Sequence, residues 1–402
     1  MLAALIISNS AYMQTKTGIE VLRENNFDIL KGKRVGLITN PTGVDPQLKS
    51  TIDILHEAGE VNLVALYGPE HGVRGNFSAG DKVGGSVDPK TGIPVFSLYG
   101  KTRKPSKDML SGIDVLVYDI QDIGARSYTY ISTMGLAMEA AAEDNIEFVV
   151  LDRPDPLGGN RVEGGLVEDG YFSFVSQYPI PYIYGLTPGE LANYLNEEGL
   201  LKGGGKCNLK VVEMENWLRN MAFADTQLPW VPTSPHIPRG NSAFFYSVTG
   251  IIGELDANSI GIGYTLPFEV FATTWLDGDK LAQRMNRFNL GGVIFRPISF
   301  KPYYMKNKGK EHAGVQIYIT DYAKVNLTEI QFRLVQAAHE LVPGSSIFEN
   351  NPNRFDMFDK VVGSSRIREK FMENYRYEDI REAWEEPAKK FKREIKKYYL
   401  YK

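Results

Sequence analysis

The sequence has very little of the chemistry that holds metals or covalent crosslinks. It contains a single cysteine, Cys207, which excludes an intramolecular disulfide framework and makes a thiolate metal site unfavourable. Its five histidines show no H-E-x-x-H or comparable spacing. We therefore predict that the protein binds no metal.

Glycine-rich phosphate cradles are also missing. Neither G-x-G-x-x-G after the first apolar run nor G-x-x-x-x-G-K-[ST] occurs, so dinucleotides and nucleoside triphosphates lose their usual binding loops. The nucleophile elbow G-x-S-x-G is absent as well. These absences predict a protein that works without a cofactor and without an activated serine.

Long apolar runs and a strong charge of either sign are lacking too. No segment is apolar and long enough to cross a bilayer, and a net charge of -4 with interspersed signs argues against a nucleic-acid surface. The opening MLAALIISNSAYMQ, a short apolar run followed by small residues, is typical of the end of a secretory signal. We predict a signal-peptide remnant over residues 1–17 and a periplasmic or secreted location, with the cytoplasm as the alternative.

The apolar patterns that are present indicate an α/β fold. At 402 residues with 43% hydrophobic content, the chain exceeds the size of a usual single core. Near-continuous apolar strings are typical of strands covered on both faces, and they alternate with segments of helical spacing over residues 46–60 and 128–144. The strings are KRVGLIT, VNLVALY, IPVFSLY, DVLVYDI and IEFVVLD. Strands alternating with helices predict a parallel sheet. In TPGELANYLNEEG, Thr187 as N-cap, Pro188 at the first helical position and Glu190 three residues after the cap predict the start of a further helix.

A change in the sequence pattern near residue 235 predicts a second domain. The segment PWVPTSPHIPRG has prolines too closely spaced for a helix, so we expect an extended seam between domains. Aromatic strands such as VIFRPISF and VQIYIT follow, with helices over residues 327–341 and 377–399. We predict a parallel-sheet domain over residues 18–235 and an α+β domain over 236–402.

Four polar loops follow four of the predicted strands and hold most of the candidate catalytic residues. They read ITNPTG, LYGPEHGVRG, YDIQDIGARSYTY and LDRPDPLGG. Because the carboxyl ends of parallel strands meet at one edge of a sheet, we expect these loops to line one crevice.

Glu70 and His71 lie in a Gly-Pro-Glu-His-Gly turn in the second loop. The flanking glycines permit a tight reversal, and a carboxyl held beside apolar strand ends could have its pKa raised toward neutrality, as suits a general acid. The alternative is that Glu70 pairs with Arg74 and His71 only caps the turn.

The third loop offers a second carboxylate. Alternation along the strand places Asp119 and Gln121 on one face and Asp122 at the tip, where it could face Glu70. Two carboxylates that flank a bond are the usual equipment of glycoside hydrolysis. Alternatively, Asp119 only caps the next helix. Tyr128 and Tyr130 are candidates for an aromatic sugar platform.

Three loop arginines could hold an anion by charge-assisted hydrogen bonds, namely Arg74, Arg126 and Arg153. The alternative for Arg153 is a pair with Asp152 or Asp155 in its own loop. Asn40, in the first loop, suits recognition of a hydroxyl or an amide. Asp152 completes the predicted binding residues.

Seven segments together resemble the exo-β-N-acetylmuramidase family over most of the chain. They are YGPEHGVRGNFSAG, PVFSLYG, YDIQDIGARSYTYISTM, LDRPDPLGGNRVEG, PYIYGLTPGELA, LPWVPTSP and LPFEVFATTW. The resemblance implies a Rossmann-like catalytic domain followed by an auxiliary domain. It also implies release of N-acetylmuramic acid from the non-reducing ends of peptidoglycan fragments in cell-wall recycling.

By position in the family motifs, Glu70 is implied to be the main catalytic carboxylate. His71, Arg74, Asn40, Asp122 and Arg126 are implied to line the pocket. The lactyl ether of muramic acid carries a carboxylate, so a selective site needs a cation. The alternative function is a non-catalytic binder of wall fragments, with turnover lost through changes such as those at residues 260–264.

Overall fold

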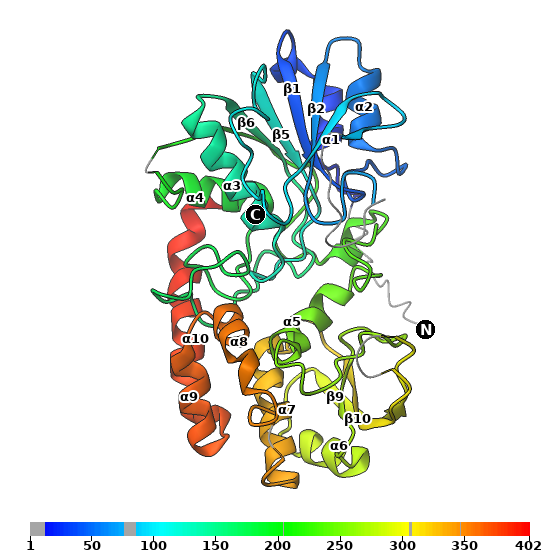
Figure 1. The fold of residues 1–402 in the computed structure, drawn as a ribbon, viewed down its shortest axis with the longest axis vertical. Coiled ribbons are helices and arrows are strands. Elements are labelled where there is room, and N and C mark those ends of the chain that lie inside the picture. The colour runs from blue at the N-terminus through cyan, green and yellow to red at the C-terminus, as the bar shows by residue number, and fades with distance from the viewer. Residues whose placement is uncertain (1–12, 76–85, 204, 305–307, 346) are drawn as a thin grey trace, which may run out of the picture.

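The computed structural model describes residues 13–75, 86–203, 205–304, 308–345 and 347–402, which form two stacked domains (Figure 1). Thr15 and Lys16 donate backbone hydrogen bonds to Thr226 and Glu215, so both belong to the first domain. The predicted signal-peptide remnant falls mostly on residues 1–12, which lie outside the described residues. In the part of the chain that is described, no helix combines the length and apolarity needed to cross a membrane.

The first domain is built on a seven-stranded sheet of order β3-β4-β2-β1-β5-β6-β7, parallel except for the short β3. The strands are β1 (Arg34–Thr39), β2 (Asn62–Gly68), β3 (Ser86–Val87), β4 (Pro94–Ser97), β5 (Val115–Asp119), β6 (Glu147–Leu151) and β7 (Asn208–Val212). Without β3, the strand order is that of a doubly wound Rossmann sheet. Successive strands are added on one side of β1 up to β4 and on its other side from β5 onward, so the switch point lies between β1 and β5. The predicted parallel sheet is confirmed.

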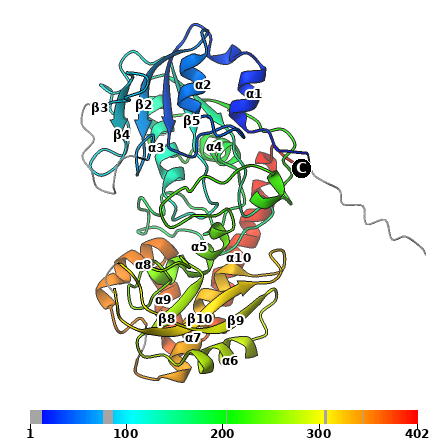
Figure 2. The same cartoon turned by 90° about the vertical axis from the view of Figure 1, so that its right-hand side faces the viewer.

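Helices cover both faces of this sheet, which explains why the central strands are apolar on both sides. One face packs on α1 (Gly18–Glu24) and α2 (Thr51–Glu57), and the other on α3 (Tyr130–Glu143) and α4 (Pro188–Glu197) (Figure 2). The predicted start of α4 is confirmed, because the Thr187 side chain accepts from the Glu190 N–H and the Glu190 carboxylate accepts from the Thr187 N–H.

The helix predicted over residues 46–60 is shorter than expected. The Asp45 carboxylate accepts the N–H groups of Gln47 and Lys49, which closes a turn there. The Ser50 hydroxyl then caps α2 by accepting from Asp53. These local polar bonds compete with the helix over its first predicted turn.

The second domain packs a three-stranded antiparallel sheet, ordered β8-β10-β9, against helices, as predicted for an α+β unit. Its strands are β8 (Val270–Thr273), β9 (Val293–Phe300) and β10 (His312–Ile319). Its helices are α5 (Ser242–Gly253), α6 (Gly278–Arg287), α7 (Leu327–Leu341), α8 (Phe355–Val362), α9 (Ser365–Asn374) and α10 (Tyr377–Glu394). The proline-rich segment before α5 is not helical, as predicted, but it is only partly extended, because a turn closes where the Ile237 N–H donates to the Ser234 carbonyl over 3.1 Å.

The two domains share packing rather than a loose hinge. One apolar cluster joins Ile123, Leu157 and Ile183 of the first domain to the core of the second. The chain end also returns to the first domain, where the Tyr401 hydroxyl donates to Asp152 over 2.6 Å and the Leu400 N–H donates to Glu190 over 2.9 Å. This continuity holds the loops at the sheet edge in a defined position over the second domain.

Candidate active site

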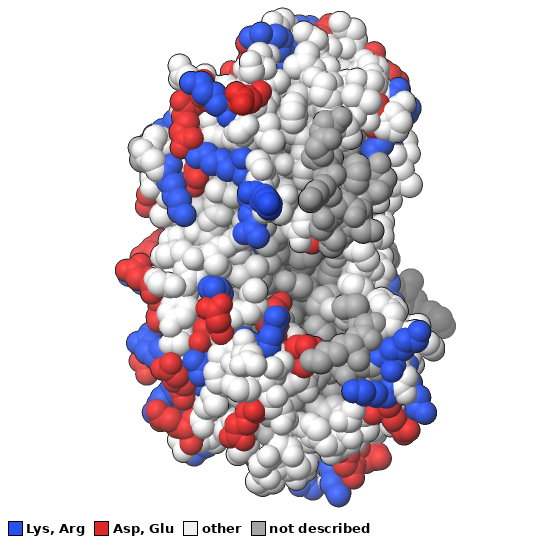
Figure 3. Space-filling model, viewed as in Figure 1, with Lys and Arg blue, Asp and Glu red and all other residues white. Residues whose placement is uncertain are grey.

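The candidate site lies where β1 and β5 end side by side, with Thr39 in register with Asp119. This is the point at which the doubly wound sheet reverses, and ligands of such folds bind outside the carboxyl ends of the strands there. The loops after β1, β2, β5 and β6 gather at this edge and face the second domain (Figure 1). The surface is hollowed at the level of the domain junction (Figure 3).

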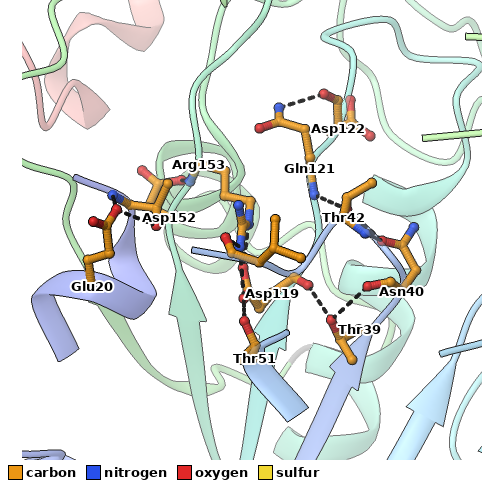
Figure 4. A network of polar contacts seen from close by, with 12 residues as sticks. Glu20, Thr39, Asn40, Thr42, Thr51, Asp119, Gln121, Asp122, Asp152 and Arg153 are labelled. Carbon is orange, nitrogen blue, oxygen red and sulfur yellow. Dashed lines mark hydrogen bonds and ion pairs between the residues drawn. The ribbon is translucent and has the colours of Figure 1, made fainter. Parts of the chain in front are cut away.

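The loops after β1 and β5 are joined by a short polar chain (Figure 4). Asn40 Oδ1 accepts from the Thr42 N–H over 2.9 Å, and Thr42 Oγ1 accepts from the Gln121 N–H over 2.9 Å. The Gln121 amide donates to the carbonyls of Asp122 and Pro154. Asn40 is thereby held by its oxygen, while its Nδ2 approaches the Tyr130 phenol closely enough to lower its pKa but makes no well-formed hydrogen bond to any described residue. That leaves one buried donor for a ligand.

Tyr130 is the point at which three of these loops meet. Its hydroxyl donates to the Thr233 carbonyl over 2.6 Å, in the segment that leads into the second domain. Burial raises its pKa, the Asn40 side chain lowers it, and the charges of Glu70 and Asp122 raise it further. Both predicted carboxylates therefore act on one phenol. Because β2 and β5 flank β1, the loops that carry Glu70, Asn40 and Asp122 leave the sheet at neighbouring strands.

Glu70 lies in a tight turn directly after β2. The Gly72 N–H donates to the Pro69 carbonyl over 3.0 Å. His71 adopts a positive φ of 74°, a backbone angle that residues other than glycine rarely take. Glu70 is half-buried and accepts a hydrogen bond from Tyr99, whose pKa this bond raises. It does not pair with Arg74, and it is the most accessible of the predicted carboxylates.

Asp122, in the loop after β5, is the buried carboxylate of the pair. Only 2% of the residue is exposed, and its Oδ1 accepts from the Gly124 N–H over 2.9 Å and from the Tyr184 hydroxyl over 2.8 Å. Its Oδ2 has no partner in the part of the chain that the structure describes. Burial raises the pKa of Asp122 to about 6. A carboxyl so placed acts on the site through the phenols around it rather than by touching a sugar.

Two of the three predicted anion-binding arginines are held by carboxylates. Arg74 binds Asp88 and Asp53, with its Nη2 2.9 Å from an oxygen of each. Arg153 Nη2 lies 3.0 Å from Asp119 Oδ2 (Figure 4). Asp119 is fully buried and also accepts from the Thr51 hydroxyl, so it neither caps a helix nor faces the crevice. We place these residues in the framework of the site.

Arg126 and Asp152 also bind other parts of the protein instead of facing the crevice. The Arg126 guanidinium is fully buried and donates to four backbone carbonyls, two of them at the end of α8 in the second domain. The carboxylate of Asp152 accepts from Thr187, Gly189 and Tyr401. Arg126 therefore ties the two domains together, and Asp152 ties the chain end to α4.

The tyrosine platform is present but is more enclosed than a free sugar platform. The rings of Tyr128 and Tyr130 pack edge to face with centroids 5.1 Å apart, and the Tyr128 hydroxyl lies 2.7 Å from Thr233 Oγ1. Tyr128 is half-buried and Tyr130 is 3% exposed. Of the two, only Tyr128 has substantial surface to offer a ligand.

Reasoning from the sequence missed the second domain's share of the site. Burial lowers the pKa of His236, and the charge of His71 lowers it further, so the segment before α5 comes near the Glu70 loop. His236 Nε2 also lies 3.0 Å from the hydroxyl of Tyr304. The closely spaced prolines predicted that this segment lies between the domains. Nothing in the local sequence predicted that His236 would lie near the Glu70 loop.

No group of three or more histidine, cysteine, aspartate or glutamate side chains within the described ranges is placed to hold a metal ion. The structure therefore defines a two-domain α/β protein with a Rossmann-like sheet and with polar loops gathered at its switch point.

Comparison with known proteins identifies the family. The N-terminal model of the family "Exo-beta-N-acetylmuramidase NamZ" matches residues 35–241, and its C-terminal model matches residues 244–401. The chain is 44% identical to the peptidoglycan beta-N-acetylmuramidase NamZ of Bacillus subtilis (strain 168), over 96% of this chain and 92% of that protein. It therefore belongs to the exo-β-N-acetylmuramidase NamZ family, and this membership makes it a glycosidase.

Two solved structures from Bacteroides fragilis NCTC 9343, both described as DUF1343 family proteins, share the fold. One has a TM-score of 0.94 and 58% sequence identity, covering 97% of this chain and 99% of that one. The other has a TM-score of 0.78 and 30% identity over the same shares. The resemblance drawn from the sequence motifs is confirmed.

Proposed function

We propose that the protein is an exo-acting glycosidase that releases N-acetylmuramic acid from the non-reducing ends of peptidoglycan fragments. The family and the relative from Bacillus subtilis support this substrate. The observation that carries the proposal is that the loops with Glu70, Asn40 and Asp122 follow three neighbouring strands, β2, β1 and β5, at the switch point of the sheet, and that the charges of both carboxylates act on Tyr130.

In this proposal Glu70 is the carboxyl that works at the glycosidic bond. It is the half-buried member of the set, and the Tyr99 hydroxyl holds its carboxylate in place. The free Nδ2 of Asn40 suits a sugar hydroxyl or acetamido carbonyl. Asp122 acts from behind, because its buried charge biases the hydroxyl of Tyr130.

The test is release of a chromogenic aglycone from a β-N-acetylmuramide. Glu70→Gln keeps the size and an acceptor oxygen but cannot exchange a proton, so we expect kcat to fall by ~100-fold or more. Glu57→Gln is the matched control, because Glu57 is an exposed glutamate that pairs with Lys49 on the far end of α2. Full activity in a folded Glu70→Gln variant would remove Glu70 from the mechanism.

A non-catalytic binder of wall fragments would give a different result with the same proteins. Calorimetry would then show saturable binding of a muramic-acid-terminated disaccharide, while product analysis would show no cleavage by the wild-type protein. A periplasmic or secreted location stays a prediction, since the opening residues on which it depends are outside those the structure describes.

A further inference from the structure

The proposed substrate carries an anion that a neighbouring sugar lacks. The lactyl group of N-acetylmuramic acid ends in a carboxylate that is ionised near neutral pH, whereas N-acetylglucosamine has a hydroxyl at that position. A site that prefers the first sugar needs a positioned cation with free hydrogen-bond donors. The inference below rests on the proposed function and concerns which residue supplies that cation.

The arginines expected from the sequence do not supply it. Arg74 and Arg153 are held by aspartates, and Arg126 donates to backbone carbonyls. Arg239, which comes from the segment before α5, is paired with Glu269. Each of these guanidinium groups already has a partner within the protein.

Arg103 is different in both exposure and partners. It lies in the segment after β4, its residue is exposed, and it makes no ion pair with any residue that the structure describes. Its Cζ lies 4.2 Å from the centroid of the Phe174 ring. A guanidinium stacked on a ring is held in a plane by cation–π attraction, while its N–H groups at the edge stay free. This arrangement prepares it for a carboxylate.

The backbone that carries the ring beneath Arg103 is itself fixed. The Ser132 hydroxyl of α3 donates to the Phe174 carbonyl over 2.7 Å, and Ser173 and Ser176 exchange backbone hydrogen bonds around it. Phe174 is therefore held against the same helix that begins with Tyr130. The stacked pair is anchored to the framework of the candidate site.

Arg103 also lies on the side of the site where Glu70 is found. β2 and β4 are neighbouring parallel strands with Gly68 beside Ser97, and the Leu98 N–H donates to the Gly68 carbonyl over 2.8 Å, so the segments that carry Glu70 and Arg103 leave the sheet side by side. Tyr99, in the second of these segments, donates a hydrogen bond to Glu70 and is also within reach of the positive charge of Arg103. Lys and Arg side chains gather on the first domain beside the hollow at the domain junction (Figure 3). A sugar that reaches Glu70 thus comes within the field of Arg103.

We propose that Arg103, held flat on the Phe174 ring, binds the lactyl carboxylate of the terminal sugar and makes the enzyme selective for muramic acid. The pairing is a salt-bridged hydrogen bond and changes no covalent bond. Glu70 performs the chemistry in either case, so Arg103 governs which sugar is accepted rather than whether cleavage occurs.

The experiment compares two chromogenic substrates, the β-N-acetylmuramide and its carboxamide, in which the lactyl charge is removed. In the wild-type protein, the carboxamide should show a kcat/KM lower by ~10- to 100-fold, the usual weight of a charge-assisted hydrogen bond. Arg103→Met should lower kcat/KM for the charged substrate by a similar factor, mainly through KM. It should leave the carboxamide almost unaffected, because the interaction is already gone.

Matched variants separate this role from general charge and from folding. Lys107→Met removes an exposed cation four residues away and should keep full selectivity. Phe174→Leu keeps the charge but removes the ring face, so we expect a smaller loss of selectivity in the same direction. Circular dichroism and thermal unfolding should be the same for Arg103→Met and Lys107→Met.

The outcomes divide cleanly. Absence of cleavage by the wild-type protein would overturn the proposed function and this inference with it. Normal cleavage with unchanged selectivity in a folded Arg103→Met variant would overturn the inference alone. A loss of selectivity in Lys101→Met instead of Arg103→Met would also overturn it, since Lys101 is an exposed cation two residues before Arg103 in the same loop.

Discussion

Replacing Asp122 by asparagine should make the protein more stable and less active at the same time. An asparagine keeps the oxygen that accepts from Gly124 and Tyr184, and its amide nitrogen takes the place of the unpartnered Oδ2. Only the charge and one proton site are lost. The substitution therefore isolates the ionised form of this buried carboxyl.

The magnitude follows from the pKa of Asp122. A value of about 6 in place of the ordinary 3.8, raised by burial, means that the ionised carboxylate costs about 3 kcal/mol in the folded state. In the variant, a buried amide N–H without a partner destabilises the folded state by ~1–2 kcal/mol, which offsets part of this gain. We expect Asp122→Asn to gain ~1–2 kcal/mol in the free energy of unfolding at pH 8.

The sign of the pH dependence is a second check. Because the folded-state pKa of Asp122 is raised, the folded protein binds more protons than the unfolded chain between pH 4 and 6. The wild-type protein therefore loses stability as pH rises through this window, and the loss is complete above the folded-state pKa. Asp122→Asn should lack this slope, so at pH 4, where the wild-type carboxyl is protonated, the variant should be the less stable protein by on the order of 1 kcal/mol, the cost of its unpartnered amide N–H.

Activity should move in the opposite direction. Without the buried charge behind Tyr130, kcat/KM for the chromogenic muramide should fall by ~10- to 100-fold, the loss typical of a group that orients a site from behind. The acid limb of the wild-type pH profile, expected near pH 6, should disappear. Urea unfolding at pH 4 and 8 and steady-state kinetics measure both effects. A variant that is less stable than wild type at pH 8, or fully active, would refute this reasoning.

Two further substitutions test the framework around the site. Burial raises the pKa of Asp155 to about 8. The wild-type protein should therefore lose on the order of 1.4 kcal/mol in the free energy of unfolding per pH unit as the pH rises from 4 to 8, and Asp155→Asn should lack this loss. Urea unfolding across that range measures it, and an unchanged slope would contradict the assignment. Arg126→Met leaves four buried carbonyls without their shared donor and should cost ~3 kcal/mol or more. A loss below 1 kcal/mol in the same assay would show that Arg126 does not tie the domains together.

Much of the fold could be predicted because its causes are local. Continuous apolar strings predicted the strands of the parallel sheet, since a strand covered on both faces has no polar side. The Thr187 to Glu190 spacing predicted the start of α4, because a capping box is completed within one turn. The helix over residues 46–60 was predicted too long, since a turn centred on Asp45 competes with it.

The sequence by itself determined that polar loops would meet at the edge of a parallel sheet, because strand direction and loop position follow from the order of apolar and polar segments. Only the tertiary structure decided which of those side chains remain free. Arg74, Arg126 and Arg153 look alike in the sequence, yet each is neutralised or enclosed by residues distant along the chain. The N–H groups of Arg103 stay available because its guanidinium stacks on the ring of Phe174, 71 positions away, and a stacked ring accepts no hydrogen bond from the edge of the guanidinium. Pairing between distant residues is a property of packing, and no local pattern encodes it.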